Sequence, residues 1–513
     1  MLKGAFSHHE RENLMNFTTP VFIFVYFPIT ISIYFVVNFL EKRKALSPVF
    51  LKFRVKDFIL IAFGMLFYMW ECFDDVFKLG VYMLGVWSAG CWIGRNRNRY
   101  IQIYERNEEE DRVYRKISLS VFILIFAVLM ILFCLVHFKY MPLWTEIWNY
   151  LFRGSLVKDS VMAPIGISFI TFSAISYLTD IYRGDAPGGT FIDCALYLSF
   201  FPKIISGPIV LWKDFSTKLD NRTVTLERFV SGLNRIMIGF AKKLILADQF
   251  GSCISNVAAG ETDMITGWGM AFLYMLEIYY DFSGYSDIAI GLAGLLGFEF
   301  EENFRFPYRS KSISEFWRRW HISLGRWFRE YIYISLGGSR RGERKAIRNA
   351  AVVFALTGIW HGAGWNYILW GGINGTMVIL ERVIRNKKFY QKQPEILKWF
   401  VTMGITFFCW QFFRFPDFGE LWDWLKLMFG RLQADTVYWS WKYYFDKEII
   451  TLAVIGAVGS VAFGGENLQG WYRRFSNCKV GFVIQEAVLL IIFVLAILFM
   501  INSTYSPFIY FQY

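Results

Sequence analysis

The chain has 513 residues, of which 55% are hydrophobic, 20% are aromatic and only 19% are charged. Soluble domains carry about 25% charged residues, so this composition argues against an ordinary soluble enzyme, and its apolar content excludes intrinsic disorder. The formal net charge of +12 is compatible with nucleic-acid binding, but in a membrane protein it more often reflects basic cytoplasmic loops.

Apolar segments long enough to cross a bilayer recur along the chain. A transmembrane helix needs about 20 mostly apolar residues, and no cleavable signal peptide is evident because residues 1–16 are polar. We predict an all-α, multi-pass protein of the cytoplasmic membrane with about 11 or 12 crossings. Regular spans are expected at 17–40, 58–73, 76–93, 117–138, 161–181, 399–413, 448–464 and 481–501, and less regular apolar stretches at 191–212, 229–248, 264–298 and 346–384.

Two of these stretches carry further information. The first span holds Pro20 and Pro28, which predict a kink because proline interrupts the hydrogen bonds of a helix. The stretch 346–384 is long enough for two crossings. We expect one membrane domain over 1–513, made of N-terminal helices at 1–190, a core at 191–385 and C-terminal helices at 386–513.

Charges in the loops predict the orientation of the spans. Segments 41–57, 94–116, 305–348 and 385–398 are rich in lysine and arginine, whereas an acidic turn lies near residues 71–75. Basic loops face the cytoplasm in most membrane proteins. The four basic segments are therefore predicted to be cytoplasmic, and residues 502–513 are predicted to lie outside.

The middle of the chain departs from a simple pattern of spans. Residues 191–331 mix Pro202, Gly207, Pro208 and many polar residues into apolar sequence. Irregular backbone at membrane depth is tolerated only where protein or a water-filled cavity covers it. We therefore expect a central pit lined by this region.

Three carboxylates, Glu277, Asp281 and Asp287, lie within an apolar stretch of this region. Each costs about 2.5 to 3.5 kcal/mol to insert at the centre of a membrane helix, so each must face protein or water. They are expected to bond arginines or to fix the tautomer of a histidine. A structural role is favoured over a functional one.

The segment that contains His321 has the pattern of an amphipathic helix. Its apolar residues recur every three or four positions, and four arginines lie off that face. We predict a helix in the plane of the inner interface, with its arginines toward lipid headgroups or an anionic ligand. For His321 itself, a structural and a catalytic role both stay open. The apolar residues are Phe316, Trp320, Leu324, Trp327 and Tyr331, and the arginines are Arg318, Arg319, Arg326 and Arg329.

The strongest candidate site is His361, in the run WHGAGWN at 360–366. If 348–360 is helical, it rises about 20 Å from the inner face and places His361 deep in the bilayer. An ionisable residue there is a functional candidate, and imidazole is a natural general base near neutral pH. The alternative is a buried histidine bonded to a backbone carbonyl, and we favour the functional interpretation.

Several other kinds of chemistry find no support in the sequence. The chain has no P-loop, no GxSxG elbow and no HExxH motif, which argues against an ATP-driven pump, a serine hydrolase and a zinc protease. None of the seven cysteines forms a CxxC pair, and most lie in apolar runs. We therefore expect neither a disulfide framework nor a metal site.

Together these motifs resemble the membrane-bound O-acyltransferase family, and specifically its bacterial alginate-O-acetylation branch. The clear match covers about residues 200–385, and the tail at 507–512 also fits. The resemblance rests on YYDFSGYSDIAIGLAGLLGF (279–298), ENFRFPYRSKSISEFWRRWHISLGRWFREYIYISLGG (302–338) and TGIWHGAGWNYILWG (357–371), with a weaker echo in FFPKIISGPI (200–209).

The resemblance implies a fold and a set of site residues. The family fold is a ring of helices around a thin core, with a tunnel that reaches the catalytic histidine. His361 matches that histidine and His321 matches the second family histidine, so both are expected to be catalytic. Asn374 stands near a position where relatives often carry another histidine. The expected substrate-binding residues are Trp317, Arg318, Arg319, Trp360, Asp281 and Tyr285.

The resemblance also implies acyl transfer from a cytoplasmic thioester, either acetyl-CoA or an acylated carrier protein, with no bound cofactor. His361 is expected to act as general base, and a transient acyl-enzyme stays open. The expected partners are membrane lipid and an exported SGNH-type protein that modifies a secreted polysaccharide or peptidoglycan; no nucleic acid is expected. The alternatives are D-alanyl transfer to teichoic acid and a polysaccharide exporter or flippase without chemistry, although transporters often show two related halves that this sequence lacks.

Overall fold

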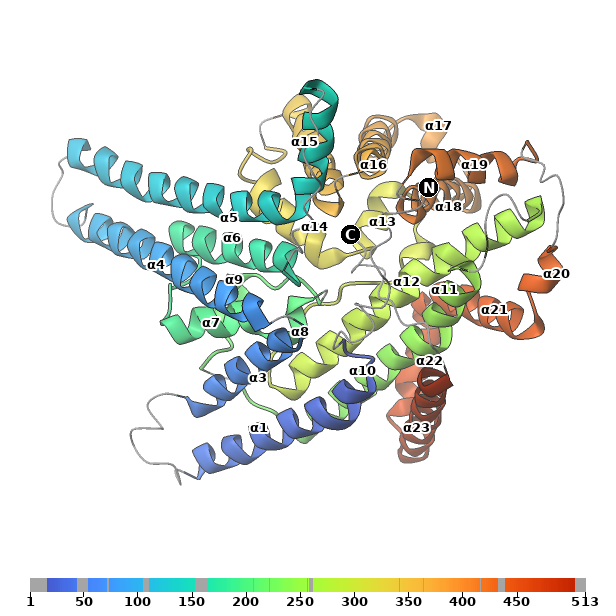
Figure 1. Ribbon diagram of the computed structural model, residues 1–513, viewed down its shortest axis with the longest axis horizontal. Helices are drawn as coiled ribbons and strands as arrows, with labels where there is room; N and C mark the ends of the chain where they lie inside the picture. The colour runs from blue at the N-terminus through green and yellow to red at the C-terminus, as the bar shows by residue number, and fades with distance from the viewer. Residues whose placement is uncertain are drawn as a thin grey trace. The chain divides into compact units, whose positions relative to one another are not determined.

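Every regular element in the described part of the chain is a helix (Figure 1), as the composition predicts. The computed structural model describes residues 16–43, 54–71, 73–104, 110–152, 164–205, 207–220, 222–255, 257, 262–340, 342–362, 364–415, 417–431 and 439–502.

Six of the described helices are long and apolar enough to cross a membrane, and each matches a predicted regular span. The prediction of an all-α, multi-pass membrane protein is therefore confirmed. The count of 11 or 12 crossings stays a prediction. The six helices are Phe22–Lys42, Phe73–Arg97, Leu119–Met141, Glu395–Arg414, Lys447–Gly464 and Lys479–Asn502.

The sidedness of the loops stays a prediction. Parts of the predicted cytoplasmic segments, at 44–53 and 105–109, lie outside the described residues. So does the tail from 503 onward, which includes the run at 507–512.

The first span begins irregularly, and the kink expected from its two prolines stays a prediction. Phe22–Tyr26 forms a π-helical turn that leads into α1 (Phe27–Lys42), and Pro28 lies in the first turn of α1. Proline has no N–H for the regular helical ladder, and a π-helical turn is one form of local irregularity in a helix.

The chain forms two compact units. The first comprises Met1–Phe138, Val161–Gly232 and Leu292–Phe300, and the second comprises Lys139–Ser160, Leu233–Gly291 and Glu301–Tyr513. The division into one domain with consecutive segments, expected from the sequence, stays a prediction.

The helices of the first unit include α3 and α6, which match the predicted spans at 58–73 and 161–181. The stretch 191–212 is instead broken into three short helices. Pro202 lies in the first turn of the second of these, where proline is tolerated, but it could not continue the preceding helix. Besides α1, the helices are α3 (Val55–Glu71), α4 (Phe73–Tyr104), α6 (Ile167–Arg183), α7 (Phe191–Ser199), α8 (Phe201–Ile204) and α9 (Trp212–Ser216).

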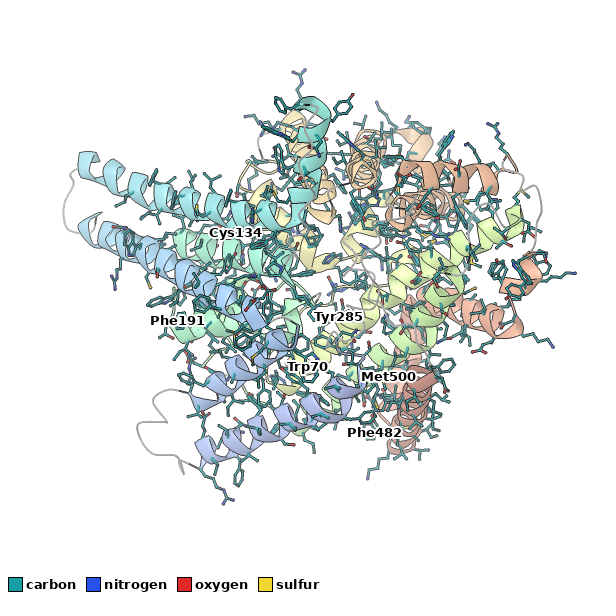
Figure 2. All side chains as sticks on the ribbon, viewed as in Figure 1. Trp70, Cys134, Phe191, Tyr285, Phe482 and Met500 are labelled. Atoms are coloured by element: carbon teal, nitrogen blue, oxygen red, sulfur yellow. The ribbon has the colours of Figure 1, made fainter. Side chains whose placement is uncertain are left out.

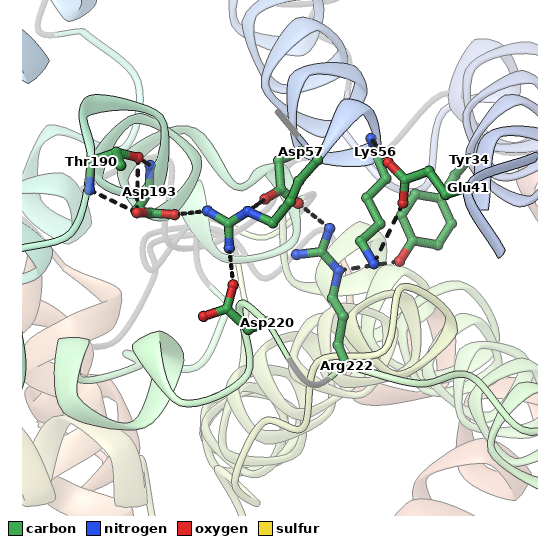
Figure 3. Close-up of polar contacts among 9 residues, drawn as sticks. Tyr34, Glu41, Lys56, Asp57, Thr190, Asp193, Asp220 and Arg222 are labelled. Carbon is green, nitrogen blue, oxygen red and sulfur yellow. Dashed lines mark hydrogen bonds and ion pairs between the residues drawn. The ribbon is translucent and has the colours of Figure 1, made fainter. Parts of the chain in front are cut away.

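Figure 3 shows a network of ion pairs in the first unit. Asp57, near the start of α3, pairs with Arg222, and both side chains are fully buried. Arg54 also contacts Asp57, at 3.1 Å, and reaches Asp193, whose carboxylate closes the capping box at the start of α7. The Arg222 Nε donates to the hydroxyl of Tyr34 on α1 at 3.4 Å. Because buried charges need partners, this network helps to fix how α1, α3 and α7 pack.

The second unit contains the C-terminal helices. The stretch 346–384 forms two of them, α15 and α16, as its length predicts. α5 (Glu110–Phe152), α10 (Leu226–Phe240) and α12 (Met264–Leu295) have residues in both units. The others are α11 (Asp248–Ser255), α13 (Ile313–Arg319), α14 (Ile322–Phe328), α15 (Glu343–His361), α16 (Trp365–Ile384), α17 (Lys388–Gln391), α18 (Glu395–Arg414), α19 (Phe418–Met428), α20 (Trp441–Tyr444), α21 (Lys447–Val461), α22 (Glu466–Ser476) and α23 (Lys479–Asn502).

Large apolar side chains are exposed on many helices of both units. Trp70 on α3 and Phe482 on α23, both labelled in Figure 2, are 55% and 44% exposed. A soluble monomer rarely leaves so many large apolar groups in water. In a multi-pass membrane protein these side chains are suited to contact lipid.

The prediction of a single amphipathic helix around His321 is wrong. α13 ends at Arg319 and α14 begins at Ile322, because His321 adopts a left-handed backbone conformation with φ 45° and ψ 52°. The Ile322 N–H leaves the helical ladder and donates to the carbonyl of Asn303 at 2.9 Å. The predicted apolar face is nevertheless correct, since all five of its residues are buried: Phe316, Trp320, Leu324, Trp327 and Tyr331.

Candidate active site

His361 lies at the point where α15 ends, and α16 begins four residues later at Trp365. The two helices pack closely through glycines: a Cβ added to Gly358 would lie 3.3 Å from the Cα of Gly371 and 2.6 Å from the carbonyl oxygen of Tyr367. The run at 360–366 therefore forms a helix break as predicted, although Ala363 lies outside the described residues. The break places an imidazole at the end of a tight helical hairpin.

The imidazole of His361 is only 4% exposed and is surrounded by aromatic rings. The ring centroids of Trp360, Trp370 and Phe413 lie 4.7, 5.0 and 5.0 Å from its own. Trp370 and Phe413 meet it edge to face. These rings hold the imidazole in a mostly apolar pocket, where its interactions with a reacting group are strengthened by the low local dielectric.

His321 is 2% exposed, and the orientation of its ring is set by one amide. Its Nδ1 lies 3.1 Å from Oδ1 of Asn303. The same oxygen accepts from the Ser323 hydroxyl at 2.9 Å, and the Asn303 Nδ2 donates to Ser286 at 3.0 Å. Because an amide oxygen only accepts, neutral His321 carries its proton on Nδ1. Its Nε2 is left with a lone pair and has no hydrogen-bond partner among the described residues.

Both histidines lie close to Trp360. The centroid of the Trp360 ring is 6.5 Å from that of His321 and 4.7 Å from that of His361. The structure therefore brings together three of the residues that the sequence singled out, although they come from the α13–α14 break and the end of α15. Their catalytic and substrate-binding roles stay predictions.

Trp317 joins the same cluster through Asn374. Its ring packs 5.4 Å from that of Trp370, and its Nε1 donates to the Asn374 Oδ1 at 3.3 Å. The Asn374 Nδ2 in turn donates to the Trp370 carbonyl at 2.9 Å. Asn374 is therefore an amide that links two tryptophans, Trp317 and Trp370.

Arg318 and Arg319, two predicted substrate ligands, have different surroundings. Arg318 is exposed. The Arg319 guanidinium bonds Glu315 at 2.9 Å and the carbonyl of Arg305 at 3.1 Å. Their role as ligands of an anionic donor stays a prediction.

Two of the three carboxylates of α12, Asp281 and Asp287, are paired with basic side chains, as the structural interpretation expected. Asp281 and Asp248 both contact the buried ammonium of Lys243, at 2.7 and 2.6 Å. Asp287 binds Arg235 at 2.7 Å. The tautomer of His321 is set by Asn303 and not by one of these carboxylates.

The same helix contributes aromatic rings near His321. Phe282 packs edge to face on the His321 ring, with a centroid distance of 4.7 Å. Tyr285, labelled in Figure 2, is buried on the next turn of α12. The assignment of Tyr285 and Asp281 to substrate binding stays a prediction.

The residues of this site that sequence reasoning missed include Asn303 and Lys139. Lys139 lies near the end of the apolar part of α5, and its ammonium donates to the carbonyl of Trp360 at 2.6 Å. A lysine at the edge of a membrane span is a recognisable signal. Asn303 carries no such signal, because only the fold brings it to His321.

Comparison with known proteins identifies the class to which this site belongs. Residues 188–415, which include both histidines, match the membrane-bound O-acyltransferase family. The chain belongs to this family, and it is a membrane-bound acyltransferase.

Individual relatives extend the match beyond the core. A probable alginate O-acetylase of Azotobacter vinelandii is 31% identical over 97% of this chain and 100% of its own length. A peptidoglycan O-acetyltransferase of Helicobacter pylori is 30% identical over 82% of this chain and 81% of its own. A teichoic acid D-alanyltransferase of Bacillus subtilis is 29% identical over 50% of this chain and 67% of its own.

Proposed function

We propose that this protein takes part in the O-acetylation of an extracellular or cell-wall polysaccharide. The observation that carries the proposal is the match to an alginate O-acetylase over 97% of this chain and the whole of the relative. The peptidoglycan O-acetyltransferase, which also matches over most of its length, supports the same kind of reaction on a different polymer.

The alternatives have less support. The D-alanyltransferase relatives match only about half of this chain, at 48% and 50%. A polysaccharide exporter or flippase without chemistry does not account for membership of an acyltransferase family. O-acetylation is therefore the function that the full-length matches favour.

In the proposed reaction, the acceptor hydroxyl attacks the carbonyl carbon of an acetyl thioester. His361 removes the hydroxyl proton as the new C–O bond forms. The C–S bond then breaks, the sulfur leaves as a thiolate, and the thiolate takes up a proton from His361 to give a thiol and an acetyl ester.

We further propose the setting of this reaction. The protein lies in the cytoplasmic membrane, and its donor is acetyl-CoA or an acylated carrier protein on the cytoplasmic side. The basic segment at 305–348 suits an anionic donor. An exported SGNH-type partner completes the transfer to the polymer outside.

The test replaces His361 with alanine in cells that lack the native gene. We expect acetylation of the extracellular polymer to fall by a factor of about 10² to 10⁴, the usual contribution of a general base. Expression and thermal stability in detergent should stay near those of the original protein. The ester-linked acetate on the purified polymer is measured directly, and its retention at the original level would overturn the assignment.

His321→Ala is a second variant in the same assay. We expect a smaller and more variable loss, because the contacts of His321 with Asn303 and Phe282 also support the local fold.

A further inference from the structure

Two consecutive side chains of α5 bind two consecutive backbone carbonyls at the end of α15. The Tyr140 hydroxyl donates to the carbonyl of Ile359. The Lys139 ammonium donates to the carbonyl of Trp360 at 2.6 Å and lies 5.5 Å from the centroid of the Trp360 ring. All four residues belong to the second unit.

These contacts satisfy backbone carbonyls at the C-terminal end of α15. The last four carbonyls of a helix have no partner within the helix, and α15 ends at His361. The C-terminal end of a helix also carries a partial negative charge, which favours a nearby cation. Lys139 and Tyr140 therefore satisfy the two carbonyls that immediately precede the candidate catalytic residue.

The presence of a lysine at position 139 indicates more than a structural anchor for the end of α15. Lys139 lies within the apolar helix Leu119–Met141, and no carboxylate acts on it among the described residues. Near the end of a membrane helix a lysine is tolerated because its side chain can reach the interface, but here the ammonium bonds the carbonyl of Trp360. Tyr140, which bonds the neighbouring carbonyl, shows that a neutral donor can serve the same kind of contact. Anchoring alone therefore does not require a charged group at this place.

We propose that Lys139 and Tyr140 are positioning residues for acyl transfer, which hold the last turn of α15 so that His361 meets the acceptor hydroxyl in a productive geometry. Lys139 acts through the carbonyl of Trp360, and its charge stabilises the helix end from which the imidazole projects. This inference rests on the proposed role of His361.

The experiment compares Lys139→Met, Lys139→Gln, Lys139→Arg and Tyr140→Phe in the full-length protein, reconstituted with its partner in vesicles. The rate of acetyl transfer is measured against the concentration of acetyl-CoA, together with thermal stability. Misplacement of a reacting group by about 1 Å can cost a factor of about 100. We therefore expect Lys139→Met to lower kcat at least about tenfold, while KM for the donor stays within about twofold.

The other variants separate the hydrogen bond from the charge. Lys139→Arg, which keeps both, should retain activity within about fivefold of the original, and the neutral donor of Lys139→Gln should give an intermediate value. Tyr140→Phe should lower kcat less than Lys139→Met does. If Lys139→Met does not fold, Lys139→Gln and Tyr140→Phe carry the test.

His137→Leu is the matched control, because His137 lies two residues earlier on the same helix and is exposed. It should leave kcat unchanged. The inference is overturned if Lys139→Met and Tyr140→Phe keep the original kcat. It is also overturned if kcat, KM and stability change together in every variant, including Lys139→Arg, since that pattern indicates a purely structural role.

His361→Ala in the same assay distinguishes a failure of the positioning role of Lys139 from a failure of the proposed role of His361. If His361→Ala is inactive and Lys139→Met is fully active, only the positioning role fails. If His361→Ala is active, the proposed role of His361 fails as well.

Discussion

At the scale of single residues, one amide sets the state of the second histidine. The Asn303 Oδ1 accepts from His321 and from both the backbone N–H and the hydroxyl of Ser323. It therefore fixes the proton of neutral His321 on Nδ1 and also supports the left-handed backbone at that residue. Removal of this oxygen is expected to destabilise the fold by more than the loss of a single hydrogen bond, because several buried donors are then left without a partner.

Asn303→Ala tests this role. We expect a loss of stability of about 1 to 3 kcal/mol, the cost of unpaired buried donors. We also expect a loss of transfer activity of about tenfold or more, because the ring of His321 is no longer held in one orientation. Thermal unfolding in detergent and acetyl transfer in vesicles measure the two effects. Ser286→Ala, which removes only the contact of the Asn303 Nδ2, is the control and should have the smaller effect on activity.

At the scale of helices, the hairpin of α15 and α16 depends on small residues. A Cβ added to Gly371 would lie 2.7 Å from the carbonyl oxygen of Phe354 and 3.1 Å from the Cα of Gly358. Both contacts are with backbone atoms, so the helices must move apart to accept a side chain. Since α15 ends at His361, a change in this packing moves the candidate catalytic residue.

Gly371→Ala should therefore lower stability by about 1 to 3 kcal/mol, as overpacking of a tight interior does, and should lower activity with it. The neighbouring Gly372 offers a matched control, because a Cβ there meets nothing within 4 Å. Gly372→Ala should be neutral or should stabilise the helix by up to about 1 kcal/mol, through its better helix propensity. Equal melting temperatures for the two variants would contradict this account of the hairpin.

At the scale of the whole molecule, the proposed reaction requires a defined orientation in the membrane. The proposed cytoplasmic thioester donor fits an orientation in which the basic segments at 305–348 and 385–398 face the cytoplasm. The loop before α15 is a suitable place for a probe, since Arg340 is exposed.

Arg340→Cys, made in a background without native cysteines, tests the orientation. A membrane-impermeant maleimide should label this cysteine in inverted vesicles but not in intact cells. A cysteine introduced near residue 502, at the end of α23, which is predicted to lie outside, should show the opposite pattern. Labelling of position 340 from outside would show that the orientation is opposite to the predicted one, and it would favour an external acyl donor.

Local sequence patterns were sufficient for the class of protein and for the helix break at which the candidate residue His361 lies. In a membrane, a long apolar segment can satisfy its backbone N–H and C=O groups by itself when it forms a helix. The six spans could therefore be predicted from hydropathy alone. The glycine-rich break after residue 360 likewise marked His361, because an ionisable residue in an apolar stretch is costly and glycine ends a helix.

Tertiary structure alone decided the break at His321 and the partners of both histidines. The period of apolar residues through 316–331 is that of a continuous helix, and it correctly predicts which side chains are buried. This periodicity does not predict the contacts of Asn303, which lies 18 residues earlier in the chain. Those contacts stabilise the left-handed turn. Nor does it predict the hydrogen bond from Lys139 to Trp360, two residues that lie 221 positions apart in the sequence. Periodicity records which face of a segment is buried, whereas these contacts depend on which donors and acceptors the fold brings within bonding distance.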